Sequence, residues 1–200
     1  MILAISSEIP VMNQIADTIG RDKKIVYIDT ASNWQTGDKT WLENQIGAIQ
    51  KEYWKVERYS IEWKNITDFK VDLSEYDIIH IWWGNTAYLL FHILKTWFDT
   101  YLREIEKSKI IIGSSAGAKI LGENIWHVQS LDDFSVVELN NYKGLWFLNF
   151  DIWAHFWKEK YREKYKKVLD VAYDWSQSWV YISDNSYIIA TSEWIKICKI

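Results

Sequence analysis

The segment that most restricts the fold is residues 109–121, where an apolar run meets a Gly-x-Ser-x-Gly pattern. Residues 109–112 read Lys-Ile-Ile-Ile, which is typical of a buried strand, and Gly113-Ser114-Ser115-Ala116-Gly117 follows directly. Residues 118–121 suit a helix. A strand, a sharp turn and a helix in this order predict a nucleophile elbow, in which small neighbours let the serine project from the carboxyl end of the strand. A Gly/Ser loop that merely ends a strand is the alternative, and the rest of the chain must decide.

Apolar runs alternate with helical patterns through the first 121 residues. Strands are expected at residues 2–6, 24–28, 56–61, 77–82 and 109–112, and helices at residues 9–19, 40–53 and 87–106, the last broken near Trp97. Such alternation predicts a right-handedly wound parallel sheet with helices on both faces. The expected fold class is therefore α/β, a doubly wound and mostly parallel sheet, and 200 residues fit a single domain over residues 1–200.

The pattern changes after residue 121. Residues 123–141 are polar and irregular, residues 145–150 form another apolar run, and residues 158–172 have the spacing of a charged amphipathic helix. Three short apolar segments follow, at residues 180–182, 187–190 and 195–198. They predict a short antiparallel hairpin system at an edge of the sheet.

Composition narrows the class of partner. The net charge is −4, and acidic and basic residues are interspersed along the chain. The sequence therefore lacks the basic stripe that would indicate nucleic acid as a partner. No apolar run approaches the roughly 20 residues of a membrane span, and the first residues lack the basic start and cleavage site of a signal peptide. Cys198 is the only cysteine, so an intramolecular disulfide is excluded and a cytoplasmic setting is expected.

A serine nucleophile needs a base, and the sequence offers four histidines. His155 is the preferred base, because it directly follows an apolar segment that, in a parallel sheet, would end at the same edge as Ser115. His80 lies within an apolar strand and His92 within a helix, so both are interpreted as packed structural residues. His127, in the irregular stretch, stays open as an alternative base.

A third group should hold the imidazole in its productive tautomer. Asp132 and Asp133 lie between Ser115 and His155 in the sequence and are the preferred acids, with Glu138 as a weaker alternative. Adjacent aspartates are also common in solvated turns, so the choice between the acids stays open.

Two backbone amides are expected to stabilise the oxyanion of an acyl-transfer reaction. Ala116 directly follows the serine. Gly84 lies in the loop after the fourth predicted strand, and glycine suits a backbone that approaches a ligand closely. Ligands of parallel α/β sheets bind beyond the carboxyl ends of the strands, where both of these loops are expected.

Taken together, these segments resemble the peptidase E family. The resemblance rests on Gly84-Asn85-Thr86 before a helix, on residues 113–118, on Asp132-Asp133, and on an apolar run that leads into Ala154-His155-Phe156. It spans nearly the whole chain in order and spacing. Members of this family are aspartyl dipeptidases and relatives, and they share a flavodoxin-like, class I glutamine amidotransferase-like fold.

The resemblance implies a Ser-His-acid, acyl-enzyme mechanism. Ser115 would be the nucleophile and His155 the base, while the amides of Gly84 and Ala116 would hold the oxyanion. The adjacent Asn85-Thr86 would contact the substrate. That substrate would be a short peptide, typically a dipeptide that begins with aspartate, and the family implies neither metal nor cofactor. An oligomer is compatible with the sequence.

The sequence departs from the family pattern at two positions. Trp83 stands where the family loop has the first glycine of Gly-Gly-Asn-Thr, and Ala154 replaces the proline usual before the histidine. An indole there would narrow the pocket, so a catalytically silent binding protein is an alternative. Another serine hydrolase on the same scaffold, cyanophycinase-like or an esterase, is a second. Lys119 and Arg103 are candidates for the cation that holds the aspartate of the substrate.

Tryptophan is unusually frequent, with 14 residues against only eight glycines, although glycine makes up about 7% of an average chain. Several stand at predicted loops or element ends: Trp34, Trp54, Trp63, Trp82, Trp83, Trp97, Trp146, Trp153, Trp175, Trp179 and Trp194. Some bacterial lineages decode UGA as glycine, whereas another genetic code reads tryptophan. We therefore hypothesise that many of these positions are glycine in the native protein. The alternative is an aromatic-rich surface that binds a partner.

Overall fold

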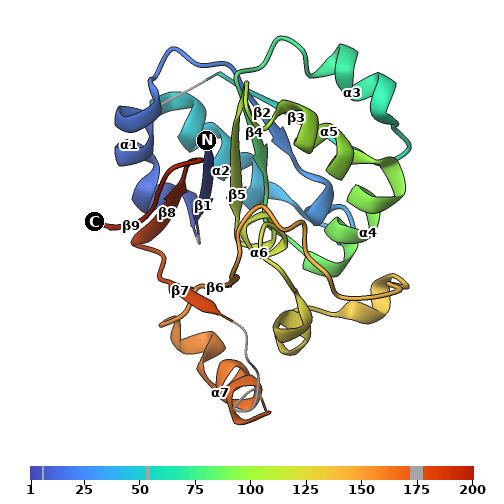
Figure 1. Cartoon of the computed structure of the whole chain (residues 1–200), viewed down its shortest axis with the longest axis vertical. Helices are drawn as coiled ribbons and strands as arrows, with labels where there is room; N and C mark the ends of the chain where they lie inside the picture. The colour runs from blue at the N-terminus through green and yellow to red at the C-terminus, as the bar shows by residue number, and fades with distance from the viewer. Residues whose placement is uncertain (6, 53–54, 172–177) are drawn as a thin grey trace.

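The computed structural model describes residues 1–5, 7–52, 55–171 and 178–200. Its centre is a seven-stranded sheet in the order β3-β2-β4-β5-β1-β8-β9 (Figure 1). The strands are β1 (Ile2–Ile5), β2 (Ile25–Ile28), β3 (Val56–Tyr59), β4 (Ile78–Ile81), β5 (Ile110–Ser114), β8 (Ser186–Ala190) and β9 (Ile195–Lys199). β1 to β5 pair in parallel, whereas β8 joins β1 and β9 joins β8 in antiparallel fashion. The predicted, mostly parallel α/β sheet is confirmed.

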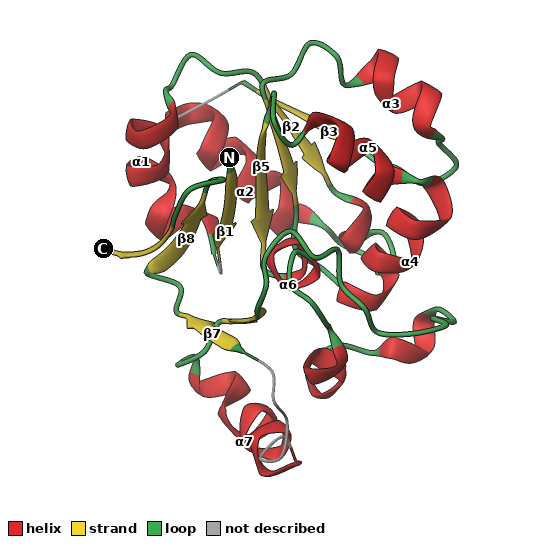
Figure 2. Cartoon of the chain, in the orientation of Figure 1, coloured by secondary structure: helices red, strands yellow, loops and turns green. Residues whose placement is uncertain are grey.

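Helices cover both faces of this sheet (Figure 2). One face carries α1 (Glu8–Ile19) and α2 (Thr40–Glu52), and the other carries α3 (Ile66–Asp72), α4 (Thr86–Thr96), α5 (Phe98–Ile105) and α6 (Ala116–Ile120). Alternate strand residues feed the two cores, so that Ile78 and Ile112 join the first while Ile79 and Ile111 join the second. Burial on both faces explains why these strands read as continuous apolar runs.

A smaller unit lies below the main sheet in Figure 1. It pairs β6 (Asp151–Ala154) in parallel with β7 (Trp179–Ile182). The short helix η4 (Glu159–Tyr161) and α7 (Arg162–Val171) follow β6, and the buried Trp153 packs against Tyr165 and Val168 of α7. The unit therefore has a small core of its own.

The predicted antiparallel hairpin is confirmed for residues 187–190 and 195–198, which lie in β8 and β9, but the prediction is wrong for its third segment. Residues 180–182 belong to β7, which pairs with β6 rather than with β8, because β6 offers a parallel backbone partner outside the main sheet. The apolar run at residues 145–150 forms a loop and no strand. The amides of Leu145 and Leu148 instead donate to the carbonyls of Ile120 and Leu121, 2.7 and 3.0 Å away, at the end of α6.

The irregular region that follows α6 contains short 3-10 helices, η2 (Trp126–Ser130) and η3 (Phe134–Val136), and η1 (Thr30–Ser32) follows β2. The predicted helices at residues 40–53 and 158–172 extend to positions that lie outside the described residues, as do Ser6, Trp54 and Trp175.

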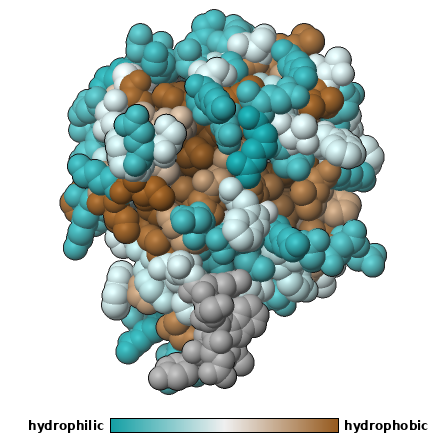
Figure 3. Space-filling model, in the orientation of Figure 1, coloured by the Kyte–Doolittle hydropathy of each residue, from teal (hydrophilic) through white to brown (hydrophobic). Residues whose placement is uncertain are grey.

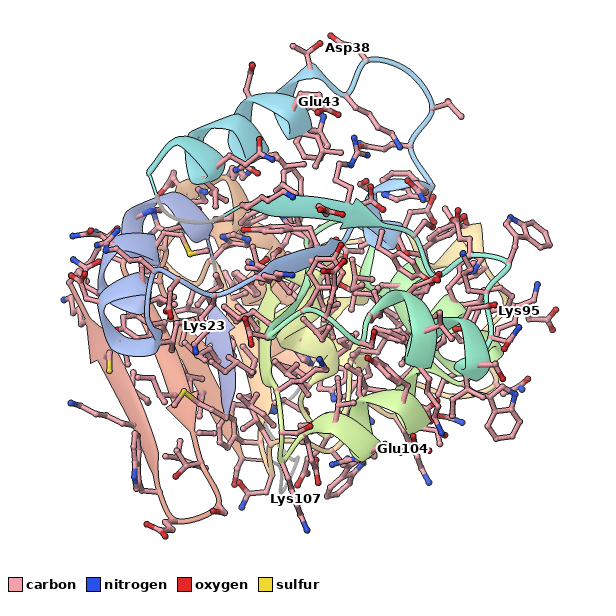
Figure 4. All side chains as sticks on the ribbon, turned by 90° about the horizontal axis from the view of Figure 1, so that it is seen from above. Lys23, Asp38, Glu43, Lys95, Glu104 and Lys107 are labelled. Carbon is pink, nitrogen blue, oxygen red and sulfur yellow. The ribbon has the colours of Figure 1, made fainter. Side chains whose placement is uncertain are left out.

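The surface shows mixed charge and scattered apolar residues. Acidic and basic side chains both lie at the periphery, as the labelled residues show in Figure 4: Asp38, Glu43, Glu104, Lys23, Lys95 and Lys107. Apolar atoms are visible among hydrophilic ones on the face drawn in Figure 3. Within the described part of the chain, no helix has both the length and the apolar character needed to cross a bilayer.

Three tryptophans adopt backbone conformations that favour glycine. Trp63, Trp97 and Trp146 have φ angles of 63°, 62° and 55°, a left-handed region that is strained for side chains with a Cβ. They are 88%, 66% and 55% exposed, so little burial of the indole offsets the strain. Trp97 ends α4, which places the break of the long predicted helix where expected. The other non-glycine residues with positive φ in the described part are Ser115 and His155.

This geometry supports the glycine hypothesis for those three positions. The backbone gives no such reason at Trp82, Trp83 or Trp194, none of which has a positive φ. Trp82 is also fully packed, at 1% exposure, between the sheet and the helices on the α1 side. The identity of the native residue at all of these positions stays a prediction.

Replacing Trp97 by glycine should stabilise the protein. Relief of the left-handed strain should raise the free energy of unfolding by about 1 kcal/mol, after the greater flexibility of glycine in the unfolded chain is subtracted. Chemical denaturation would measure it. Trp157→Gly is the matched control, because Trp157 is 83% exposed without a positive φ. A less stable Trp97→Gly would contradict the strain interpretation.

The mass of the protein purified from its native host should be lower than the printed sequence gives. Each glycine in place of a tryptophan removes the mass difference between an indolylmethyl group and a hydrogen atom. Intact mass spectrometry would count the replacements, and peptide mapping would locate them. A mass equal to that of the printed sequence would end the glycine hypothesis.

Candidate active site

Ser115 stands at the turn between β5 and α6. Its φ of 50° and ψ of −103° form a strained combination for a residue with a side chain. The turn is held in place by the Ser115 amide, which donates to the Ile5 carbonyl at the end of β1, 2.9 Å away. A Cβ on Gly117 would lie 2.0 Å from the carbonyl oxygen of Ile81 in β4. Close packing of the turn on β4 therefore requires glycine there.

His155 and Asp184 emerge from the ends of two adjacent parallel strands. Ala154, the last residue of β6, pairs with Ile182, the last residue of β7. His155 Nδ1 lies 2.5 Å from Asp184 Oδ1, and His155 Nε2 lies 2.9 Å from Ser115 Oγ. When Nδ1 donates to the carboxylate, Nε2 can accept the hydroxyl proton. The predicted convergence of Ser115 and His155 is thus present in the geometry, and it joins the main sheet to the small unit.

The two predicted acids do not contact His155. Asp132 Oδ2 accepts from the amide and the hydroxyl of Thr86, at 3.0 and 2.5 Å. Asp133 caps η3 by accepting from the Ser135 amide at 2.8 Å. The prediction that Asp132 or Asp133 orients the imidazole is therefore corrected, because their carboxylates tie down neighbouring loops.

Asp184 is the acid that the sequence analysis missed. A signal for it exists, since Asp184 closely follows the apolar residues 180–182 just as His155 follows β6. The prediction that residues 180–182 belong to a hairpin at an edge of the sheet left this similarity between Asp184 and His155 unnoticed. The weaker alternative, Glu138, is exposed and has no hydrogen bond to His155 in the described structure.

Gly84 lines the same cavity as Ser115, and Ala116 directly follows Ser115 at the start of α6. Gly84 has a φ of 150°, and a Cβ there would lie 2.0 Å from the Ala31 carbonyl oxygen, so no other residue fits this loop. Ala116 is the first residue of α6, where backbone amides have no partner inside the helix. The role of the two amides as oxyanion donors stays a prediction.

Asn85 and Thr86 have partners within the protein. Asn85 Oδ1 caps α4 by accepting from the Tyr88 amide at 2.9 Å, and its Nδ2 donates to the Asp133 carbonyl at 2.6 Å. Thr86 is held by Asp132. Asn85 lines the cavity beside Ser115, whereas Thr86 does not. The predicted substrate contact is thus geometrically open to Asn85 alone.

A cavity of about 700 Å³ opens beside Ser115 and His155, a size suited to a small ligand. Four lysines line it: Lys119, Lys158, Lys160 and Lys164. Trp83 also lines it, but its indole Nε1 donates to Gln45 Oε1 at 2.8 Å and its ring packs on Trp41 at 4.1 Å. These contacts draw the indole toward α2, so it narrows the cavity without filling it.

The electrostatics favour a neutral imidazole and an ionised acid. Burial lowers the pKa of His155, and the hydrogen bond to Asp184 offsets this only in part. Burial alone would raise the pKa of Asp184, but its bonds to His155 and to Lys158 Nζ, 2.5 Å from Oδ2, bring it to about 2. At neutral pH, His155 can therefore accept a proton while Asp184 carries the charge that stabilises the imidazolium.

The other three histidines are packed elsewhere. His80 is fully buried with Nε2 3.0 Å from Ser114 Oγ, and His92 is buried on α4, as predicted. His127, left open as a base, is buried with Nε2 3.0 Å from the Ile152 carbonyl, which accounts for its position without a catalytic role. Burial lowers the pKa of both His80 and His127 to about 3.

Of the two candidate cations for the substrate, only Lys119 lines the cavity. Arg103 donates to the Leu145 carbonyl and stacks on the Phe147 ring, outside the cavity lining. Within the residues that the structure describes, no group of three or more His, Cys, Asp or Glu side chains is arranged to hold a metal ion.

The fold and the Ser–His–Asp chain define an α/β protein with a hydrolase-like site at the carboxyl ends of parallel strands. The chain belongs to peptidase family S51, whose family model matches residues 2–198. This finding supports the resemblance to peptidase E that the sequence motifs indicated.

Uncharacterized peptidases of Listeria are among the relatives. The chain is 31% identical over 136 residues to one from Listeria monocytogenes and to one from Listeria innocua, and each alignment covers 67% of this chain. These alignments span 66% and 65% of the two relatives, slightly under two thirds of their length. An uncharacterized peptidase of Pasteurella multocida is 24% identical over 152 residues, 75% of this chain and 73% of its own.

Two solved structures share the fold. A candidate peptidase E protein from Listeria monocytogenes EGD-e superposes with a TM-score of 0.87 at 25% identity, covering 100% of this chain and 98% of its own. A peptidase from an acI-B1 actinobacterium gives a TM-score of 0.61 at 17% identity, covering 99% of this chain and 86% of its own. The second likeness concerns the fold alone.

Replacing Asp184 by asparagine should lower kcat on a cleaved substrate by roughly 10³- to 10⁴-fold, because the amide no longer fixes the tautomer or stabilises the imidazolium. If His155 is the base, activity should be lost as the pH falls through its lowered pKa. Loss of the bond to Asp184, which raises that pKa, should move the acid limb of kcat/KM to still lower pH. Steady-state kinetics across pH measures both effects.

The matched control for this experiment is Asp133→Asn, since Asp133 lies in the cavity wall but bonds Ser135. It should keep its kcat within a few fold of the unmodified protein. An Asp133→Asn variant as damaged as Asp184→Asn would contradict the assignment of Asp184 as the orienting acid.

Proposed function

We propose that this protein is a serine peptidase that hydrolyses short peptides, in particular dipeptides with an N-terminal aspartate. The observation that carries the proposal is the Ser115–His155–Asp184 hydrogen-bonded chain at the edge of a cavity of about 700 Å³. A cavity of this size accommodates a dipeptide better than a folded protein chain.

In the proposed mechanism, Ser115 is the nucleophile of an elbow between β5 and α6. His155 Nε2 takes the hydroxyl proton as Oγ attacks the scissile carbonyl, and the amides of Gly84 and Ala116 donate to the oxyanion that forms. The imidazolium, stabilised by Asp184, then gives its proton to the leaving amine. A water molecule, activated by the same imidazole, hydrolyses the acyl-enzyme and restores the hydroxyl.

The family resemblance and the charge of the cavity support this substrate class. The Listeria monocytogenes structure is named as a candidate peptidase E, and the sequence motifs resemble that family, which implies dipeptides that begin with aspartate. The lysines around the cavity suit an anionic substrate. The isolated Cys198 supports a cytoplasmic setting, in which such peptides arise as end products of protein degradation.

Two alternatives use the same site differently. Another serine hydrolase, cyanophycinase-like or an esterase, would share the Ser115 chemistry and differ in the acyl group accepted. A binding protein without turnover is favoured by Trp83, which narrows the cavity beside Gly84. A reactive but non-peptidolytic Ser115 would indicate the first alternative.

Ser115→Ala should abolish release of aspartate from Asp-Leu, lowering kcat by at least about 10³-fold, because no acyl-enzyme can form. Amino-acid analysis of a dipeptide panel would measure turnover, and a fluorophosphonate probe would report the reactivity of Ser115. Ser114→Ala is the matched control, since Ser114 Oγ bonds the buried His80 instead of His155. Turnover that survives in Ser115→Ala would overturn the proposed mechanism.

A further inference from the structure

Lys119 is a buried cation next to the nucleophile. It lies one helical turn after Ser115 in α6, and its amide donates to the Ser115 carbonyl at 3.0 Å. Only 3% of the residue is exposed, yet it lines the cavity together with Ser115 and His155. The side chain therefore reaches the inner wall of the cavity, away from the protein surface.

Lys119 has no anionic partner within the described ranges of the chain. Its ammonium forms neither an ion pair nor a hydrogen bond there, whereas Lys158 pairs with Asp184 and Lys164 donates to the Leu131 carbonyl at 3.4 Å. Burial of an unpaired charge is costly, so such groups are normally paired or neutralised. A ligand that enters the cavity can supply the missing anion.

The acids in the cavity wall are already engaged by other groups. Asp132 accepts two hydrogen bonds from Thr86, and Asp133 accepts from Ser135. The positive charge of Lys119 is also felt at the reaction centre, where it contributes to the lowered pKa of His155. A carboxylate bound to Lys119 would thus lie within electrostatic range of the imidazole.

We propose that Lys119 determines substrate specificity by binding a carboxylate of the peptide, so that the enzyme selects a charged substrate over its neutral amide. The inference rests on the proposed peptidase function. Two groups of an Asp-X dipeptide lie a few bonds from the scissile carbonyl: the aspartate side chain and the terminal carboxylate. Either carboxylate can accept a charge-assisted hydrogen bond from the Lys119 ammonium, and the test below shows which of the two does so.

The kinetic test compares Asp-Leu, Asn-Leu and Asp-Leu amide on the unmodified protein and on Lys119→Met, which keeps the length of the side chain. Loss of one charged hydrogen bond should lower kcat/KM for Asp-Leu by roughly 10- to 100-fold. The analogue that lacks the recognised carboxylate should change by less than about 3-fold on substitution, and its identity reveals which carboxylate Lys119 binds. Lys107→Met, an exposed charge change on the surface, should leave all three rates unchanged.

A binding measurement keeps the inference independent of turnover. Calorimetry would compare the same three peptides on Ser115→Ala and on Ser115→Ala/Lys119→Met, after circular dichroism shows that both variants are folded. If the double variant is unfolded, Lys119→Gln replaces Lys119→Met in the kinetic and in the binding measurements. The preference for the carboxylate over the amide should be present in the first protein and absent from the second.

The outcomes separate this inference from the proposed function. Turnover with an equal loss for all peptides in Lys119→Met would overturn the role of Lys119 while the peptidase assignment stands. Absence of turnover together with a Lys119-dependent carboxylate preference in binding would overturn the peptidase assignment and retain Lys119 as the anion-binding residue. An unchanged preference in the double variant would also overturn the inference.

Discussion

The parallel pairing of strands is the constraint on which the site depends. β4 and β5 pair so that the loop of Gly84 and the turn of Ser115 end at one edge of the main sheet. Parallel pairing has the same effect in the smaller sheet. There β6 and β7 end side by side, so that His155 and Asp184, which follow them, lie next to each other. The hydrogen bond from Ser115 to His155 joins the two edges, so three chain segments far apart in sequence meet without any long loop.

Much of this arrangement is readable from the sequence because it depends on short-range geometry. The Gly-x-Ser-x-Gly turn can be recognised because it needs glycine where it touches the next strand: Gly117 packs directly against the backbone of β4. The long predicted helix breaks at Trp97, where the backbone turns left-handed. His155 could be chosen among four histidines because an apolar strand delivers it, whereas His80, His92 and His127 lie in packed positions.

What the sequence could not supply was the pairing of β7. An apolar segment followed by a polar turn and a second apolar segment has the local form of a hairpin, and nothing local identifies a partner 29 residues away, the separation of His155 and Asp184. Because β7 was assigned to the hairpin, Asp184, which follows it, was not recognised as a partner of His155. The prediction for Asp132 was wrong for a related reason. Its position between Ser115 and His155 in the sequence is the one expected for an orienting acid, but its carboxylate accepts from Thr86 at the start of α4.

The small unit of β6, β7 and α7 has its own core, built on Trp153, Tyr165 and Val168, and it contributes the imidazole and its carboxylate but not the alcohol. The same strands also pack on the core of the main sheet through Ile152, Ala154 and Ile182. In the proposed proton relay, these two packed regions must keep their alignment, since a misplacement of about 1 Å can cost roughly 100-fold in rate. A void opened beneath Trp153 would disturb the packing of β6 on α7, and with it the support of His155, while the seven strands of the main sheet keep their own contacts. In the proposed mechanism, the alignment of the two packed regions therefore matters as much as the identity of the reacting groups.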